Sequence, residues 1–196
     1  MYIGINDTTQ KLLNTNFSSS TANWITYIEA GSPAIEWDSS QGGCVRIDQT
    51  LGSTPTKAGV YQQVTLDKDD MVSMSMRIKF IKSSGSTNPT ALKGSFLASN
   101  DGGGSWVNLG YTSFEYSIYW KRVDFDVTGL FPFTANETDE YLVKFQPEFT
   151  TGSGSNAYIL LDDCRLYTQN FKLKKITNIT ASPSLSTIAE IDGGGQ

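Results

Sequence analysis

Paired carboxylates are the residues of this chain whose types and spacing could support acid–base chemistry. Glycoside hydrolysis needs two carboxylates flanking the scissile bond, one of them as acid and the other as base or nucleophile. The candidates are Asp69 with Asp70, and Glu137 with Asp139 and Glu140. They lie among polar residues between apolar segments, where turns are expected. We therefore interpret these carboxylates as solvated turn residues and not as a catalytic pair.

The chain of 196 residues contains no histidine. This removes Ser–His and Cys–His nucleophilic catalysis and most zinc catalysis. The glycine-rich stretch 101–104 lacks the lysine and the following helix of a phosphate-binding loop. We predict that the protein is not an enzyme and that it requires no cofactor.

Residues 99–106 follow the pattern Ser-x-Asp-x-Gly-x-Ser-Trp, an Asp-box of the kind found in sialidases and other β-proteins. In such a turn Asp101 can accept backbone N–H bonds, and Gly103 permits a positive φ. Trp106 can pack back over the hairpin. Because sialidase propellers carry several copies and this chain carries one, we interpret Ser99, Asp101, Gly103 and Trp106 as a structural turn.

Ligand binding is the alternative to catalysis, and exposed aromatic rings are candidate binding residues because sugars stack on them. Aromatic residues follow one another closely after this turn, at Tyr111, Phe114, Tyr116, Tyr119 and Trp120. Trp37, which we place in a turn, is a further candidate. Three interpretations of these residues stay open: an edge strand with part of the core, a sugar platform, or a subunit interface.

Composition and periodicity predict the elements that must position these residues. Charged residues make up only 18% of the chain, and a chain of this length suits one domain with a substantial core. Apolar and polar residues alternate over 60–66, 72–80, 122–127 and 141–146. Further strands are expected around 12–15, 23–30, 43–49, 94–99 and 157–167. The pattern predicts an all-β fold, an antiparallel β-sandwich of the jelly-roll type.

The charge, the hydropathy and the cysteines of the chain exclude some classes of partner and bear on its location. A net charge of −5 argues against a nucleic-acid surface, and no apolar run is long enough to span a membrane. The first residues lack the basic start and apolar core of a signal peptide. Cys44 and Cys164 are interpreted as buried free thiols, with a disulfide bond as the alternative.

Several segments, in this order, resemble those of carbohydrate-binding modules with the galactose-binding-like jelly-roll fold. They are 12–17 followed by Asn23 and Trp24, then 44–47, 59–66, 119–125 and 161–166. The resemblance covers roughly residues 11–168. It implies a fold that commonly binds sugars without cutting them, with Trp24 in the core.

The resemblance also bears on a structural calcium ion. The family often carries a glutamate directly after the phenylalanine of its opening segment, where this chain has Ser18 after Phe17, and paired aspartates in its closing strand. The aspartates are present here as Asp162 and Asp163. Since calcium takes about six to eight oxygen ligands, two interpretations stay open: a calcium site completed by backbone carbonyls, or a hydrogen-bonded strand end.

We divide the chain into an N-terminal arm (1–10), a jelly-roll domain (11–168) and a C-terminal extension (169–196) for oligomerisation or linkage. Alternation over 176–181 indicates an added strand there. The first hypothesis is a non-catalytic structural or adhesion protein of a bacteriophage virion, a head decoration, fibre or tail component made in the host cytoplasm. Its partners would be other virion proteins or a cell-surface glycan, and we favour a homotrimer. The alternative is a carbohydrate-binding module of a secreted polysaccharide-degrading enzyme.

Overall fold

The computed structural model describes residues 2–49, 55–67, 71–82, 88–89, 91–130, 138–150 and 157–175. Apart from a short 3₁₀ turn at Ser40–Gly42, its regular elements are all strands. The strands are β1 (Tyr2–Gln10), β2 (Ile25–Ala30), β3 (Ile35–Asp38), β4 (Cys44–Asp48), β5 (Thr56–Asp67), β6 (Met71–Lys82), β7 (Ala91–Ser99), β8 (Val107–Ser113), β9 (Lys121–Leu130), β10 (Thr138–Thr150) and β11 (Ala157–Lys175). The predicted all-β class is confirmed.

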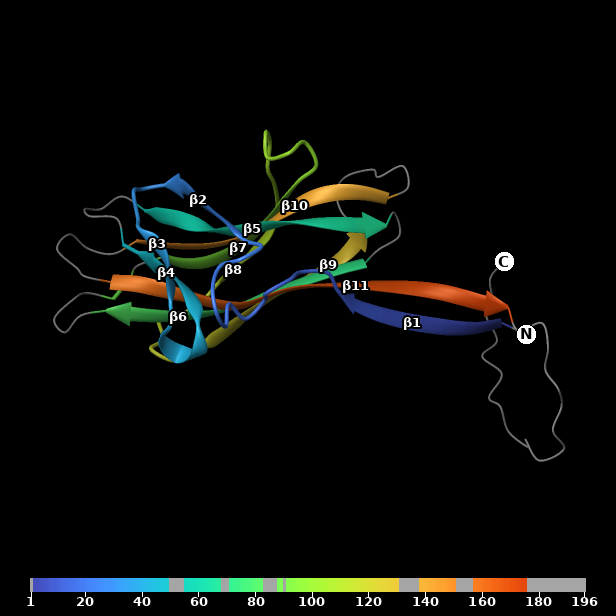
Figure 1. Ribbon diagram of the computed structural model, residues 1–196, viewed down its shortest axis with the longest axis horizontal. Helices are drawn as coiled ribbons and strands as arrows, with labels where there is room; N and C mark the ends of the chain where they lie inside the picture. Colours follow the sequence, from blue (N-terminus) through green and yellow to red (C-terminus); the bar gives the residue numbers. More distant parts are fainter. Residues whose placement is uncertain are drawn as a thin grey trace, which may run out of the picture. The chain divides into compact units, whose positions relative to one another are not determined.

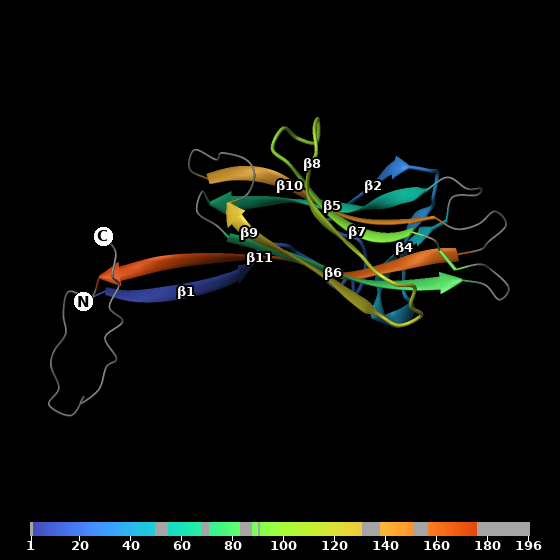
Figure 2. The same cartoon turned by 180° about the vertical axis from the view of Figure 1, so that it is seen from behind.

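The strands form two antiparallel sheets that lie face to face as two layers (Figure 1, Figure 2). The five-stranded sheet has the order β2-β5-β10-β7-β8. The six-stranded sheet has the order β3-β4-β11-β6-β9, with β1 also paired to β11. Neighbours in these sheets are distant in the sequence, as in β5 with β10 and β4 with β11. The predicted antiparallel jelly-roll sandwich is therefore confirmed.

The core lies between the sheets and is built from the inward residue of each alternating pair. On β6 the predicted inner face is buried at every position: Val72, Met74, Met76, Ile78 and Phe80. Trp24, which the resemblance placed in the core, is buried with its ring 5.4 Å from Phe17 and 5.7 Å from Phe145. Phe145 lies 5.7 Å from Phe96 in turn, so a chain of tilted and edge-on rings fills the middle of the core.

The expected strand at 12–15 is wrong, because the chain forms a hydrogen-bonded loop there. Asn14 and Phe17 both have a φ of 47°, which an extended strand does not allow. The Asn14 side-chain amide donates to the Ser20 carbonyl oxygen over 2.8 Å. The Trp24 indole donates to the Asn14 carbonyl oxygen over 2.9 Å. Side-chain to backbone bonds of this kind compete with strand pairing.

The strands β1 and β3 were not predicted, and β8 was covered only by the interpretation of the aromatic segment as an edge strand with part of the core. Three residues placed in turns are in strands: Trp37 lies on β3, and Asp139 and Glu140 lie on β10. The four residues of β3 alternate between apolar and polar side chains, so this short strand could have been predicted from the sequence. The expected strand at 157–167 is longer than predicted, since β11 continues to Lys175 and crosses the proposed boundary between 168 and 169.

The chain forms two compact units, one of residues 7–170 and one of residues 1–6 with 171–196. The sandwich core belongs to the first unit. In the second unit the described residues are 2–6 and 171–175, which are the ends of β1 and β11. The predicted strand at 176–181 and the carboxylates Asp69, Asp70 and Glu137 lie outside the described residues. In the part of the chain that is described, no helix is long and apolar enough to span a membrane.

Candidate functional site

The outer face of the five-stranded sheet is set by its central strand, β10. The inward side chains Tyr141, Val143 and Phe145 are buried in the core. The alternate side chains Leu142, Lys144 and Gln146 therefore belong to the outer face. On β5, Tyr61 pairs with Lys144 and Gln63 pairs with Leu142. Because residues directly opposite one another share a face, both β5 side chains lie on this outer face as well.

Two half-buried aromatic rings contact Lys144 on this face, and a third ring packs against both of them. The Lys144 Nζ atom lies 3.9 Å from the centre of the Tyr27 ring and 3.7 Å from the centre of the Trp106 ring. The Tyr61 ring is 5.6 Å from Trp106, edge-on, and 6.2 Å from Tyr27. We call Tyr27, Tyr61, Trp106 and Lys144 the aromatic–lysine cluster. It presents ring surface at the middle of the sheet.

Tyr27 reaches the cluster from the edge strand β2 by crossing β5 at a glycine. Its cross-strand partner is Gly59, which offers no side chain to obstruct the ring. A Cβ atom at Gly59 would clash with the Phe145 carbonyl oxygen, so β5 and β10 approach closely at this point. The Tyr27 hydroxyl donates a hydrogen bond of 2.7 Å to the Gln146 side-chain oxygen. The Tyr27 side chain is thus held at its backbone by the pairing of β2 with β5 and at its hydroxyl by the bond to Gln146.

Burial shifts the titration of two cluster residues. It lowers the pKa of the Lys144 ammonium, an effect that the nearby Glu29 carboxylate partly opposes. It raises the pKa of the Tyr27 phenol well above its ordinary value, and Glu29 adds to that rise. At neutral pH the phenol is therefore protonated and available as a donor.

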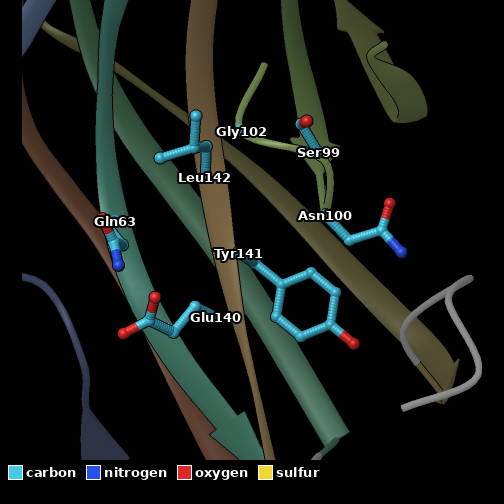
Figure 3. A pocket seen from close by; sticks show the side chains of 7 residues that line it. All are labelled: Gln63, Ser99, Asn100, Gly102, Glu140, Tyr141 and Leu142. Carbon is cyan, nitrogen blue, oxygen red and sulfur yellow. The ribbon is translucent and has the colours of Figure 1, made fainter. Parts of the chain in front are cut away.

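A groove of about 440 Å³ lies on the same face, next to the cluster. Its lining residues come from β5, from β10 and from the turn between β7 and β8: Gln63, Ser99, Asn100, Gly102, Glu140, Tyr141 and Leu142. Figure 3 shows Gln63 and Glu140 on one side and Ser99 and Asn100 on the other, with Leu142 and Tyr141 between them. The side chains that line the groove are therefore mainly polar: two amides, a carboxylate and a hydroxyl lie around the apolar Leu142 side chain, while the Tyr141 side chain is buried in the core.

The turn at 99–105 forms one wall of the groove and is closed by Asp101. The Asp101 carboxylate accepts hydrogen bonds from the Ser105 hydroxyl at 2.6 Å, the Ser105 N–H at 2.9 Å and the Ser99 hydroxyl at 2.6 Å. These bonds, chiefly the one from the Ser105 hydroxyl, hold the pKa of Asp101 well below its ordinary value. Gly102 and Gly103 have φ of 71° and 95°, which other residues rarely adopt. The turn then delivers Trp106 to the cluster.

Replacing Asp101 by alanine is expected to open this turn without unfolding the sandwich. Hydrogen exchange at the Ser105 and Gly103 amides should become severalfold faster, because the acceptor network is lost. Since the folded pKa is lowered, the network of the wild type persists as pH falls through the ordinary aspartate value and is lost only well below it. Asp101→Asn, which keeps one acceptor oxygen, should give an intermediate rate. Unchanged exchange in Asp101→Ala would contradict this role.

The structure does not bring the predicted aromatic residues together. Tyr111 lies on β8, is 60% exposed and pairs with Ser95, which places it on the outer face of the five-stranded sheet. Phe114 and Tyr116 are half-buried and pack against the core, with the Tyr116 ring 5.4 Å from Phe80. This packing agrees with the interpretation of an edge strand with part of the core, and a binding role of these two residues stays a prediction.

The remaining aromatic candidates lie away from the groove. Tyr119 is 74% exposed. Trp120 directly precedes β9, and its ring faces the Arg77 guanidinium at 5.2 Å. Trp37, on β3 of the six-stranded sheet, donates its indole N–H to the Phe17 carbonyl oxygen over 2.8 Å. No single platform can include these three side chains and the cluster, since Trp37 and Arg77 belong to the other sheet.

Asp162 and Asp163 lie at a bulge in β11. Asp163 has a φ of 51° and its carboxylate pairs with the Arg165 guanidinium at 2.5 Å. The Asp162 carboxylate accepts the Asp163 N–H over 2.7 Å, and burial raises its pKa. Among the described residues no group of three or more histidine, cysteine, aspartate or glutamate side chains could hold a metal ion. A calcium site that backbone carbonyls complete stays a prediction.

Cys44 and Cys164 are free, buried thiols. Burial raises the pKa of Cys44 to about 12 and that of Cys164 well above its ordinary value. Both are therefore protonated and unreactive at neutral pH.

Comparison with known proteins adds information on the fold. No protein-family model matches the sequence, and no curated protein matches it. A carbohydrate-binding module solved in complex with β-1,4-galactotriose has a TM-score of 0.52 at 14% identity, over 81% of this chain and 97% of that one. A xylan-binding domain from Paenibacillus barcinonensis has a TM-score of 0.50 at 14% identity, over 83% and 95%.

The chain shares its β-sandwich fold with these two carbohydrate-binding proteins. The fold is also present in the enzymatically active domain of tailspike protein 4 of bacteriophage CBA120, with a TM-score of 0.53 at 11% identity. That match covers 80% of this chain and 21% of the tailspike chain. At these identities the likeness is one of fold.

Sequence reasoning did not identify Tyr27, Tyr61 or Lys144 as site residues. Tyr61 and Lys144 were visible as the outward members of alternating segments. Their proximity depends on the pairing of β5 with β10, which joins residues 61 and 144. Alternation shows that two side chains leave the core, but it does not show which strands are neighbours.

Proposed function

We propose that this protein is a non-catalytic glycan-binding module and that the outer face of its five-stranded sheet is the binding surface. The observation that carries the proposal is the aromatic–lysine cluster beside a polar groove on one sheet face. The apolar C–H faces of sugar rings stack on aromatic side chains, while their hydroxyl groups need hydrogen-bond partners. The cluster offers the rings, and Gln63, Asn100 and Glu140 offer the partners.

The fold supports this proposal, because structures with the same sandwich include a module bound to galactotriose and a xylan-binding domain. A hydrolytic role finds no support in the groove. Glycoside hydrolysis needs two carboxylates about 5–10 Å apart. Among the described lining residues of the groove, Glu140 is the one carboxylate.

The test is a glycan array followed by calorimetry with the purified protein. We expect retention on a subset of oligosaccharides, including β-1,4-galactan or xylan fragments, and no release of reducing ends from them. An absence of binding to every glycan would overturn the proposal. Release of reducing ends would overturn the non-catalytic part.

The finer proposal is that the module serves in a bacteriophage virion, where it binds other virion proteins or a cell-surface glycan. The tailspike similarity supports this setting. The alternative, a carbohydrate-binding module of a secreted polysaccharide-degrading enzyme, is supported by the carbohydrate-binding modules that share the fold. Detection of the chain in purified phage particles favours the first setting. A hydrolase domain in the same polypeptide favours the second.

Within the virion proposal the protein is a homo-oligomer, with a trimer favoured. The pairing of β1 with β11 near both ends of the chain supplies an antiparallel ribbon for subunit contacts. A two-stranded ribbon is marginally stable by itself, so a third strand from another copy would stabilise it. Light scattering should then give the mass of three chains, and a monomer would contradict this part.

A further inference from the structure

Lys144 is a buried cation on the face where an exposed lysine would be expected. It is 5% exposed, although its neighbours along β10 show that it points away from the core. Within the described residues its ammonium takes part in no ion pair and no hydrogen bond. Its contacts are the ring faces of Tyr27 and Trp106, at 3.9 and 3.7 Å from the ring centres.

Two ring faces, together with the nearby Glu29 carboxylate, compensate the burial of this charge. Removing an ammonium from water is costly. Desolvated cation–π contacts offset part of that cost. The position of the charge and the positions of the two rings are therefore coupled, because displacing either ring removes part of this compensation.

The two rings come from opposite edges of the sheet and meet over its centre. Tyr27 is on the edge strand β2, and Trp106 directly precedes the other edge strand, β8. Lys144 lies on the central strand β10. Tyr27 crosses β5 over Gly59, and Trp106 reaches both Lys144 on β10 and Tyr61 on β5. One ammonium thus joins side chains from both edges of the five-stranded sheet.

We propose that Lys144 is a positioning residue, whose ammonium holds the Tyr27 and Trp106 rings on either side of β10 and so shapes the surface that a ligand meets. The effect of Lys144 on glycan affinity rests on the proposed function, whereas its effect on the ring positions does not. The ammonium lies against the rings, so a ligand meets the rings and not the charge. Affinity should then depend on Lys144 but not on the charge of the ligand.

The test compares Lys144→Met, which keeps the length of the side chain without its charge, with Lys144→Arg, which keeps a cation. In the wild type, nuclear magnetic resonance should show the ε-methylene protons of Lys144 shifted upfield by the two rings. In Lys144→Met the Trp106 indole resonance should move, and the affinity for β-1,4-galactotriose and for a xylan tetrasaccharide should fall about tenfold, or 1.4 kcal/mol. The affinity of Lys144→Arg for the same glycans should stay within about threefold of the wild type, on the order of 0.7 kcal/mol.

Lys93→Met is the matched control, because Lys93 is on the same sheet and its Nζ lies 5.4 Å from the Tyr111 ring, outside the cluster. It should leave the Trp106 resonance and the affinity unchanged. Thermal unfolding of Lys144→Met should occur at the wild-type temperature or above it, because a buried charge is removed. A loss of binding would then not be a loss of folding.

Three results would overturn the inference. The first is that the ε-methylene protons of Lys144 are unshifted in the wild type. The second is that the Trp106 indole resonance and the glycan affinity are both unchanged in Lys144→Met. The third is that the wild type binds trigalacturonate more tightly than galactotriose and that Lys144→Met abolishes this preference. The last result would make Lys144 a ligand contact. If the wild type binds no glycan while the Trp106 resonance moves in Lys144→Met as expected, the proposed function fails and the positioning role stands.

Discussion

Replacing Tyr61 and Trp106 together by alanine is expected to weaken glycan binding at least 100-fold. Aromatic anchors at binding sites each contribute about 2 kcal/mol, or roughly 30-fold. The two rings are 5.6 Å apart, so their effects will not be fully additive. Isothermal titration with the oligosaccharide retained best on the array measures the loss. Thermal unfolding of the variant shows whether the sandwich is intact.

The matched control is the double replacement Tyr119→Ala with Trp120→Ala. It removes the same two residue types from the aromatic segment that the sequence indicated, at positions away from the groove. Binding should stay within about twofold of the wild type. If the control loses affinity and the Tyr61/Trp106 variant keeps it, the binding surface is the segment before β9 and not the sheet face.

Replacing Phe145 by alanine is expected to lower the free energy of unfolding by about 4 kcal/mol. Phe145 is fully buried on the central strand β10, and its ring contacts Trp24 and Phe96 at 5.7 Å. The lost ring leaves a cavity that two large neighbours cannot easily close. Urea denaturation measures the change, and the melting temperature should fall by roughly 10 °C.

The control for this prediction is Tyr119→Ala, at a side chain that is 74% exposed. It should change the free energy of unfolding by less than about 0.5 kcal/mol. A loss below about 1 kcal/mol in Phe145→Ala would mean that the middle of the core repacks, and that the ring chain from Phe17 to Phe96 is not the centre of the sandwich.

Strand β10 contributes both to the proposed binding surface and to the buried core. Phe145 faces the core, and Lys144, the preceding residue, faces the rings of the outer surface. The Phe145 carbonyl also approaches Gly59, the glycine over which Tyr27 crosses. The platform therefore lies on a strand whose inner face is fully buried, which favours a preformed site.

Features that depend on neighbours in the chain could be predicted from the sequence. Alternation over 72–80 predicted the buried face of β6, because successive side chains of a strand point to opposite sides. The Asp-box predicted a turn in which Asp101 accepts hydrogen bonds, since all of its partners lie within four residues. The absence of histidine excluded several kinds of catalysis by composition alone, because those mechanisms need an imidazole.

Features that depend on strand pairing could not be predicted in this way. For the aromatic segment after residue 110, a sugar platform was one of three open interpretations, because its rings are close in sequence. The tertiary structure instead divides those rings between the core and two different sheets. Tyr27, Tyr61, Trp106 and Lys144 are far apart in the chain and meet because β2, β5 and β10 are neighbours in one sheet. The sequence by itself determined which side chains leave the core and how the turn closes, because these are local properties. Only the tertiary structure decided which of those side chains meet, because strand order is determined by the packing of the whole sandwich.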